Sequence, residues 1–195
     1  MLSRGLSAQF GGSPPRAGRR RYGSAVLIAM AGLPGAGKST VADALGRRTG
    51  WPVLSVDPVE AALLGAGVTS DQPTGLAAYL AVGALAEHLL RLGQTVVVDA
   101  VNAAPEARAQ WEDLARRTRT PLCFVEVVCS DVDLHRQRLT DRRRDLGDLP
   151  EPRWDSLDQR REQLAGWSGP RLVLDSAGAV EELVDALVTE LTGTG

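Results

Sequence analysis

One nine-residue segment constrains this chain more than any other feature: residues 32–40 read GLPGAGKST and match the pattern G-x-x-x-x-G-K-[ST]. The segment lies between an apolar run and a stretch with helical spacing, which is the context that the pattern requires. Its three glycines let successive backbone N–H groups face one concavity, and the following helix adds its positive end there. We therefore predict a phosphate-binding loop made of Gly32, Leu33, Pro34, Gly35, Ala36, Gly37, Lys38, Ser39 and Thr40.

The lysine of this segment is the only one in the chain, because the other 21 of the 22 basic residues are arginines. Its presence at the position that the pattern requires argues against a chance match. Lys38 is expected to contact the outer phosphates of a nucleotide, and the Ser39 hydroxyl is expected to ligate Mg²⁺. Without a second lysine the chain cannot contain the N-K-x-D segment that reads guanine in Ras-type GTPases. ATP is thus favoured by elimination, although other guanine pockets exist.

Five short apolar runs, at residues 25–31, 52–56, 95–98, 122–129 and 171–174, alternate with stretches of helical spacing. Runs that are apolar almost throughout are typical of strands buried on both faces. Their alternation with helices indicates a parallel sheet covered by helices on both sides. We predict an α/β fold, a three-layer α/β/α sandwich, in one domain over residues 25–195. The predicted helices cover residues 39–48, 75–92, 105–118, 132–144, 155–164 and 180–191.

The first 24 residues differ in composition from the rest: they are rich in Gly, Ser, Pro and Arg, and they contain five arginines and no acid. We interpret them as a disordered tail. A dispensable extension is favoured over an organellar transit peptide, because Gly and Pro would interrupt the amphipathic helix that such a peptide needs. The net charge of the chain is −2, so the body after this tail carries −7, which disfavours binding to long nucleic acid.

Two further observations bear on location. No apolar run reaches the roughly 18 residues of a transmembrane helix, so no membrane partner is expected. Cys123 and Cys129 lie in one predicted strand, about 20 Å apart at about 3.3 Å per residue, which is too far for a disulfide. Free cysteines are typical of a reducing compartment, and we expect the protein to be cytoplasmic.

Two acidic residues end predicted strands: Asp57 closes WPVLSVD and Asp99 closes TVVVD. The carboxyl ends of parallel strands meet at one edge, where the phosphate loop also emerges. A carboxylate there can bind Mg²⁺ or accept a proton from an attacking hydroxyl. Asp57 also fits a helix N-cap, followed by Pro58 and a capping-box Glu60, and both roles could hold. Asn102, the only asparagine, fits a substrate contact and a turn equally well.

The segment after the fourth predicted strand contains five arginines within nine residues. A solvated basic face is the usual interpretation of such a run. The sharper one is a mobile helix that closes over a bound triphosphate and supplies positive charge to the transferring group. Arg138 and Arg142 are favoured for this role, since their i, i+4 spacing puts them on one face. Residues 60–80 and 146–170 are expected to line an acceptor pocket, with Trp154 and Trp167 as its cover.

Residues 25–192 resemble the small P-loop kinase-like ATP-binding proteins that are often labelled AAA-family ATPases. That group is similar to chloramphenicol phosphotransferase, zeta toxin, gluconate kinase and the kinase domain of polynucleotide kinase. The resemblance rests on GLPGAGKST, LSVD, VVVDA and VVCSDVDLHRQRLTDRRR. It implies a P-loop NTPase fold with a five-stranded parallel sheet. It also implies that Asp57 matches the acid that activates the acceptor hydroxyl in several relatives, and that residues 175–178 hold the adenine edge.

The chain departs from the motor proteins that share this label. Asp99 is followed by Ala100, so the Asp-Glu pair of motor ATPases is absent, and 195 residues leave no room for their helical lid domain. The AAA label therefore does not imply a ring-forming unfoldase.

The first hypothesis is a P-loop kinase that uses ATP and Mg²⁺ to phosphorylate a hydroxyl of a small metabolite or antibiotic. Its catalytic residues would be Lys38, Asp57, Arg138 and Arg142, with Ser39 and Asp99 at the metal. One alternative is a slow ATPase that acts as a nucleotide-dependent switch or binding protein. Another is a polynucleotide-end or nucleotide-sugar kinase. No motif identifies the acceptor, and a monomer and a homodimer are equally compatible with the sequence.

Overall fold

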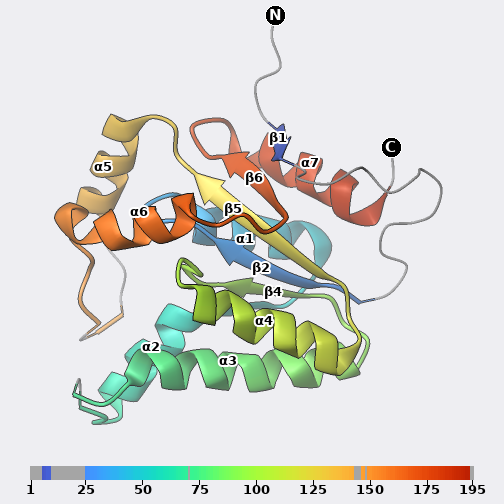
Figure 1. The fold of residues 1–195 in the computed structure, drawn as a ribbon, viewed down its shortest axis with the longest axis horizontal. Helices are drawn as coiled ribbons and strands as arrows, with labels where there is room; N and C mark the ends of the chain where they lie inside the picture. The colour runs from blue at the N-terminus through green and yellow to red at the C-terminus, as the bar shows by residue number, and fades with distance from the viewer. Residues whose placement is uncertain (1–5, 10–24, 70, 143–145, 148, 194–195) are drawn as a thin grey trace, which may run out of the picture.

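The computed structural model describes residues 6–9, 25–69, 71–142, 146–147 and 149–193. Its sheet has six strands in the order β1-β6-β5-β2-β4-β3 (Figure 1). Five of them are parallel, which confirms the predicted five-stranded parallel sheet. These five are β2 (Leu27–Ala31), β3 (Val53–Ser55), β4 (Val96–Asp99), β5 (Leu122–Val128) and β6 (Arg171–Asp175).

The sixth strand, β1 (Leu6–Gln9), pairs antiparallel with β6, with Leu6 opposite Leu174. At these four residues the predicted disordered tail is wrong. The physical reason lies in β6, which would otherwise be an edge strand with unpaired N–H and C=O groups along one side. Any extended segment without proline can take such an edge, so the sequence of the segment carries no signal for it. The remainder of the predicted tail, residues 1–5 and 10–24, lies outside the described residues.

The central strand explains the layers. All five residues of β2 are buried, and alternate ones join different cores. Leu27, Ala29 and Ala31 pack in a core with residues of α3 and α4, while Ile28 and Met30 pack in a second core with residues of α1 and α7. Successive side chains of a strand point to opposite faces, so a strand that is apolar throughout needs a helical layer on each side. The predicted three-layer sandwich is confirmed (Figure 1).

The helices follow the predicted ranges to within a few residues, with one addition. Helix α2 was not predicted, although the capping pattern at residues 57–60 pointed toward it. A short 3-10 turn, η1, covers Trp154–Leu157. The helices are α1 (Lys38–Thr49), α2 (Val56–Gly65), α3 (Thr74–Arg91), α4 (Pro105–Thr118), α5 (Val132–Asp141), α6 (Asp158–Ala165) and α7 (Val180–Thr192).

The N-cap predicted at Asp57 is wrong. Strand β3 is only three residues long, and the chain turns directly into α2, so the N-cap position falls on Ser55 and Asp57 lies in the first turn. Glu60 does not close a capping box either, because its Oε1 accepts a hydrogen bond from the Thr74 hydroxyl at 2.8 Å. This bond joins α2 to the first residue of α3.

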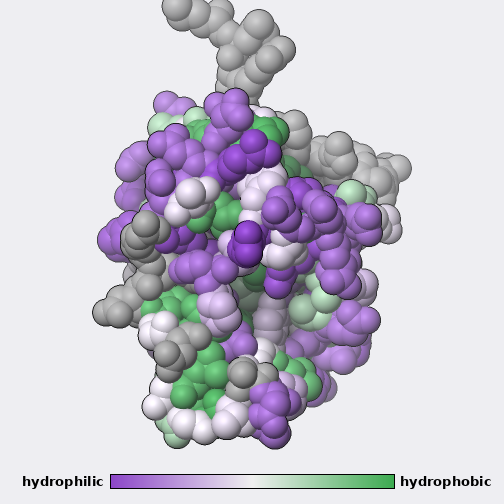
Figure 2. Space-filling model, turned by 90° about the vertical axis from the view of Figure 1, so that its left-hand side faces the viewer, coloured by the Kyte–Doolittle hydropathy of each residue, from purple (hydrophilic) through white to green (hydrophobic). Residues whose placement is uncertain are grey.

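Helix α3 is apolar on its solvent face as well as on its packed face. Ala78, Val82, Ala86 and Leu90 are buried, whereas Leu76, Leu80 and Leu85 are each more than half exposed. Figure 2 shows hydrophobic side chains gathered at the lower end of the molecule, where α2 and α3 lie. In the part of the chain that the structure describes, no helix combines the length and the apolar character needed to cross a membrane.

Candidate active site

The phosphate loop connects the end of β2 to the start of α1, and its glycines are there for steric reasons. Gly32 has φ 132°, and a Cβ on it would collide with the carbonyl oxygen of Val127 in β5. Gly37, with φ 90°, is the N-cap of α1, and a Cβ there would lie 3.2 Å from the Ser176 side chain. At both positions φ is positive and another part of the chain lies where a Cβ would be. Only glycine meets both conditions without strain.

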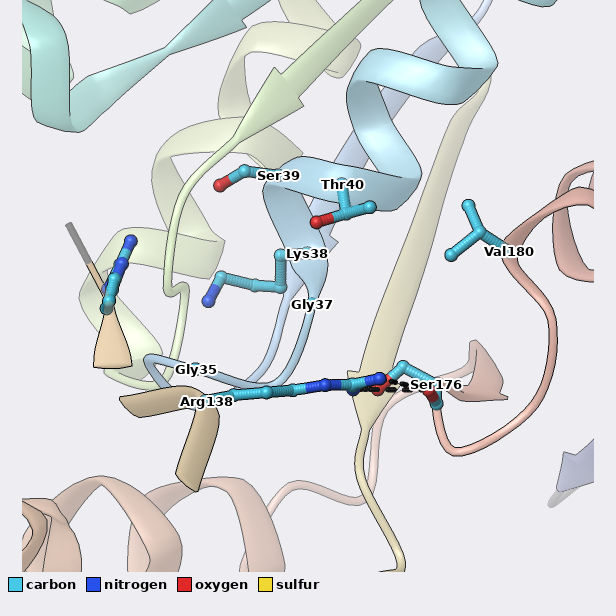
Figure 3. A pocket seen from close by; sticks show the side chains of 9 residues that line it. Gly35, Gly37, Lys38, Ser39, Thr40, Arg138, Ser176 and Val180 are labelled. Carbon is cyan, nitrogen blue, oxygen red and sulfur yellow. Dashed lines mark hydrogen bonds between the residues drawn. The ribbon is translucent and has the colours of Figure 1, made fainter. Parts of the chain in front are cut away.

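Lys38 is the first residue of α1 and is buried, with its Nζ donating a hydrogen bond to the Leu33 carbonyl at 3.0 Å. Its side chain therefore folds back over the loop instead of extending into solvent. Ser39 and Thr40, in the same first turn, are exposed. Figure 3 shows the three side chains around the opening of the loop.

Two cavities open on the side of this loop that carries Lys38 and Ser39. The first, of about 460 Å³, is shown in Figure 3 and lies between the loop, α5 and the turn before α7. The second, of about 280 Å³, lies toward the ends of β3 and β4. Lys38, Ser39 and Arg142 line both, so the cavities adjoin at the first turn of α1. The first is also lined by Gly35, Gly37, Thr40, Arg138, Ser176 and Val180, and the second by Pro34, Asp57, Glu60, Asp99, Ala100, Val101, Leu149, Pro150, Pro152 and Arg160.

The two predicted acids both line the second cavity. Asp99 is buried at the end of β4, and its Oδ2 accepts a hydrogen bond from the Ser55 hydroxyl at 3.2 Å. Ser55 is paired with Asp99 in the parallel register of β3 and β4, and Asp57 follows two residues later in α2. The sheet edge thus brings Asp57 and Asp99 to the same cavity, as the sequence predicted.

The donor set around this edge suits magnesium brought in with a nucleotide. Among the described residues, no three His, Cys, Asp or Glu side chains are grouped so that they could hold a metal ion alone. Mg²⁺ usually takes one or two carboxylates and completes its shell with substrate phosphate oxygens and water. Ser39 and Asp99, a hydroxyl and a carboxylate lining one cavity beside the loop, fit that requirement.

The two favoured arginines both line the first cavity, but they make different contacts. Arg138, on α5, donates from Nη1 to the Ser176 hydroxyl at 2.9 Å and from Nη2 to the Ser176 carbonyl at 3.2 Å. Figure 3 shows its side chain extended below the loop toward Ser176. Arg142 follows the end of α5, and its guanidinium lies 3.9 Å from Asp57 and 3.8 Å from Glu151.

Of the remaining arginines of this run, only Arg136 is among the described residues, and it does not line the first cavity. Arg136 stacks its guanidinium on the ring of Trp154, 5.0 Å from the centroid. Residues 143–145, which include the last two arginines, lie outside the described residues. The run is therefore not one uniform basic face within the described part of the chain.

His135 is a site residue that the sequence analysis did not identify. It is buried, and its Nε2 lies 2.8 Å from the Pro34 carbonyl in the phosphate loop. A carbonyl can only accept, so Nε2 carries the proton in this bond. Burial lowers the pKa of His135 despite this hydrogen bond, and the charges of Arg161, Lys38 and Arg138 act in the same direction as burial. The available signal was its spacing, three residues before Arg138 on one helix.

Asn102 has the turn role rather than the substrate contact. It is fully buried with φ 48°, its Nδ2 donates to the Met30 carbonyl at 2.6 Å, and its Oδ1 accepts from Trp111 Nε1 at 2.8 Å. The proposed tryptophan cover of the acceptor pocket is also wrong, since neither Trp154 nor Trp167 lines the second cavity. Trp167 is buried against Phe124 in the core, and Trp154 packs on the ring of His135.

Tyr79 of α3 lies behind the two acids. Its hydroxyl is 3.4 Å from the backbone nitrogen of Asn102. Burial raises the pKa of Tyr79 to about 12, and the negative charges of Asp57 and Asp99 contribute to this rise. The phenol is therefore protonated at any physiological pH.

The turn after β6, at residues 175–178, borders the first cavity. Asp175 accepts hydrogen bonds from the backbone nitrogens of Ser130 at 3.0 Å and Ala177 at 3.1 Å. Although burial acts to raise it, the pKa of Asp175 is lowered, mainly because Ser130 donates to its carboxylate. The ionised carboxylate ties the start of α5 to the turn that carries Ser176.

Comparison with known proteins agrees with this fold. A family model described as an AAA domain matches residues 27–164, from β2 to α6. No curated protein matches the chain.

Several solved structures share the arrangement. A sugar kinase from Janibacter sp. HTCC2649 has a TM-score of 0.61 at 16% identity, covering 85% of this chain and 93% of its own. The APS kinase of Mycobacterium tuberculosis in complex with AMPPNP and APS has a TM-score of 0.61 at 19% identity, covering 88% and 99%. Kti12 of Chaetomium thermophilum in complex with ADP-AlF3 has a TM-score of 0.58 at 23% identity, covering 83% and 96%. At these identities the likeness shows a common fold.

Proposed function

The chain belongs to the AAA domain family, and on this basis we propose that it is an ATP- and Mg²⁺-dependent phosphotransferase acting on a hydroxyl group of a small molecule. One observation carries the proposal: two cavities adjoin at the phosphate loop, and Lys38, Ser39 and Arg142 line both. A hydrolase or a switch needs only the first cavity, whereas a kinase needs a second site for its acceptor. The sugar kinase and APS kinase with the same fold support this reading.

In the proposal, the first cavity takes the nucleotide. The backbone N–H groups of the loop and the start of α1 hold the phosphates. Lys38, now bonded to the Leu33 carbonyl, turns its ammonium to the outer phosphates. Arg138 and Ser176 lie on the opposite wall, where they would contact the nucleotide and limit access of water.

Mg²⁺ would be held by Ser39 directly and by Asp99 directly or through water. When bound, it would neutralise phosphate charge and so make the terminal phosphorus easier to attack. Asp99 is positioned for this by the Ser55 hydroxyl, which already satisfies one of its oxygens.

The second cavity takes the acceptor. Asp57 would accept the proton of the acceptor hydroxyl as its oxygen bonds to the γ-phosphorus and the bond to the β,γ-bridging oxygen breaks, releasing ADP. Arg142 borders both cavities, so its positive charge would lie beside the phosphoryl group as it passes from the nucleotide to the acceptor. Most of the rate enhancement would come from positioning and charge neutralisation.

We extend the proposal to the cellular location of the enzyme and to the size of its acceptor. Cys123 and Cys129 are both free, in keeping with a reducing, cytoplasmic location. A small acceptor is favoured over a long nucleic acid because the body of the chain is acidic.

The test is ATP turnover with Mg²⁺ against a panel of sugars, sugar acids, nucleosides, aminoglycosides, amphenicols and short oligonucleotides. We expect ADP release that depends on an acceptor, that Lys38→Ala abolishes, and that Asp57→Asn removes while ATP binding persists. Asp43→Asn serves as the matched control, since Asp43 is exposed on α1 and lines neither cavity. ATP hydrolysis that no acceptor stimulates would favour the switch, and stimulation by oligonucleotides would favour the end kinase.

A further inference from the structure

The charged residues that line the second cavity differ in the partners that the structure gives them. Three of its six charged residues are acids, and each has a partner: Asp57 faces Arg142, Glu60 accepts from Thr74, and Asp99 accepts from Ser55. Arg142 is held between Asp57 and Glu151. Lys38 belongs to the phosphate loop. Arg160 is the sixth.

Arg160 lies on α6 and is partly buried, and its recorded hydrogen bond runs from Nη1 to the Ser156 carbonyl at 3.3 Å. Among the described residues, no carboxylate lies within ion-pair distance of it, whereas its neighbour Arg161 pairs with Asp158. Arg160 lines the second cavity together with Asp57 and Asp99. A guanidinium has five N–H donors, and its bond to the Ser156 carbonyl involves one nitrogen, Nη1.

The rest of the lining limits the kind of ligand. Its uncharged side chains are aliphatic, small or proline, together with Ser39, and none of the described lining residues is aromatic. Nucleobases and aromatic drugs are usually held by stacking on aromatic side chains or on guanidinium planes. A volume of about 280 Å³ is also at the small end for a ligand site. The cavity therefore suits a compact, non-aromatic molecule.

We propose that the acceptor is a small polyhydroxylated anion, a hydroxy acid or a sugar phosphate, whose anionic group binds Arg160. The inference rests on the proposed function and names the substrate class of the same site. Arginine binds carboxylate and phosphate through paired, charge-assisted hydrogen bonds, so Arg160 is suited to bind the anionic group of the acceptor. The second oxygen of Glu60 and the carboxylate of Asp57 then accept hydrogen bonds from hydroxyls of the same molecule. Without Arg160, these acids would favour a cationic acceptor.

The experiment uses matched acceptors that differ in the anionic group: gluconate against sorbitol, glycerate against glycerol, and glucose 6-phosphate against glucose. Acceptor-dependent ADP release is measured for the full chain, for Arg160→Gln and Arg160→Lys, and for the control Arg153→Gln, whose exposed side chain lines neither cavity. Comparing the two carboxylate pairs with the phosphate pair identifies whether the enzyme recognises a carboxylate or a phosphate. Calorimetric titration of each anion into the protein with Mg²⁺ and AMPPNP measures binding without turnover.

We expect the anionic member of at least one pair to be phosphorylated and its neutral partner to be a poor acceptor. Arg160→Gln should raise the KM for that acceptor about 10- to 100-fold, the effect of one charge-assisted hydrogen-bonded pair, while the KM for ATP stays within about twofold. Arg160→Lys should recover part of the loss, and Arg153→Gln should resemble the wild type.

Two results would overturn the inference while leaving the kinase intact: neutral or cationic acceptors used as well as the anions, or equal behaviour of Arg160→Gln and Arg153→Gln. If neither turnover nor binding responds to any acceptor of the wider panel although ATP binds, the proposed function itself fails, and this inference fails with it.

Discussion

The guanidinium of Arg142 lies 3.9 Å from the carboxylate of Asp57, Nη2 to Oδ2, and thereby connects the end of α5 with the first turn of α2. Both side chains are only partly exposed, at 18% for Arg142 and 38% for Asp57. The distance is longer than a hydrogen bond, so the pair aligns the two charges without locking them together. The arrangement places a positive charge beside the carboxylate that we propose as the proton acceptor.

Replacing Asp57 by Asn tests its role as the proton acceptor. The change keeps the shape of the side chain and removes the base, so kcat for phosphoryl transfer should fall about 10²- to 10⁴-fold. The affinity for ATP should remain within a few-fold, because Asp57 lines only the second cavity. Steady-state kinetics combined with equilibrium ATP binding separates the two effects. An unchanged kcat would remove Asp57 from the mechanism.

Lys38→Ala should lower kcat/KM for ATP by at least about 10²- to 10³-fold, the effect of losing one preorganised donor at a developing charge. The fold should persist, because the lysine donates one hydrogen bond to a loop carbonyl and fills no core position. Far-ultraviolet circular dichroism checks the fold, and coupled ADP detection measures the rate. A variant with wild-type turnover would contradict the assignment of the loop.

Arg138 and Ser176 should act as one unit at the nucleotide. Arg138→Gln removes the guanidinium contacts from α5 to the turn after β6, whereas Ser176→Ala removes only the bond to the Ser176 hydroxyl and keeps the bond to its backbone carbonyl. The KM for ATP should rise several-fold in Arg138→Gln and less in Ser176→Ala, and the double variant should be little worse than Arg138→Gln. In a double-mutant cycle, residues in contact show a coupling energy of about 0.5–3 kcal/mol. Strictly additive effects would show that the contact has no role in binding.

The lowered pKa of buried His135 predicts a pH dependence of stability. An exposed histidine in the unfolded chain takes up a proton near pH 6.5, whereas the folded protein resists protonation at this site. The contribution of His135 to the free energy of unfolding is therefore complete above about pH 6.5 and is lost as pH falls toward its lower folded pKa.

Urea unfolding of His135→Gln between pH 7.5 and 5 should show a shallower loss of stability than the wild type. Glutamine does not titrate and retains an amide donor for the Pro34 carbonyl. His88→Gln is the control, since His88 is exposed. Equal pH slopes in the wild type and His135→Gln would contradict the prediction.

Asn102→Ala tests the structural role of the only asparagine. The substitution leaves the Met30 carbonyl and Trp111 Nε1 without their buried partner, at a cost of about 1–3 kcal/mol for each unsatisfied group. Thermal unfolding should show a clear decrease in Tm, while the KM for ATP of the folded fraction should not change. A stable variant with a raised acceptor KM would instead indicate a substrate contact.

The parallel sheet and the phosphate loop could be predicted because their causes are local. Each apolar run between helical stretches requires burial on both faces. Three spaced glycines followed by a lysine, between a strand and a helix, are typical of a phosphate-binding loop. The same logic placed Asp57 and Asp99 at one edge, since a residue that ends a parallel strand must emerge there.

Other features depend on residues distant in the chain. Strand β1 forms because β6 would otherwise be an unpaired edge, and the paired residues Leu6 and Leu174 are 168 positions apart in the chain. His135 matters because it meets the Pro34 carbonyl, and Asn102 is a turn residue because Met30 and Trp111 bond to it. The cluster of arginines was visible in the sequence, but only packing divided it between Ser176, Asp57 and Trp154.

Periodicity and glycine spacing are local properties of the chain, so they were enough to predict the layers of this protein and its phosphate loop. Which charged side chain lines which cavity depends on packing between distant segments. Arg160 shows the difference: in the sequence it is one of 21 arginines, and in the fold it lines a cavity whose three carboxylates each have a partner. Long-range contacts select partners, and no local pattern records them.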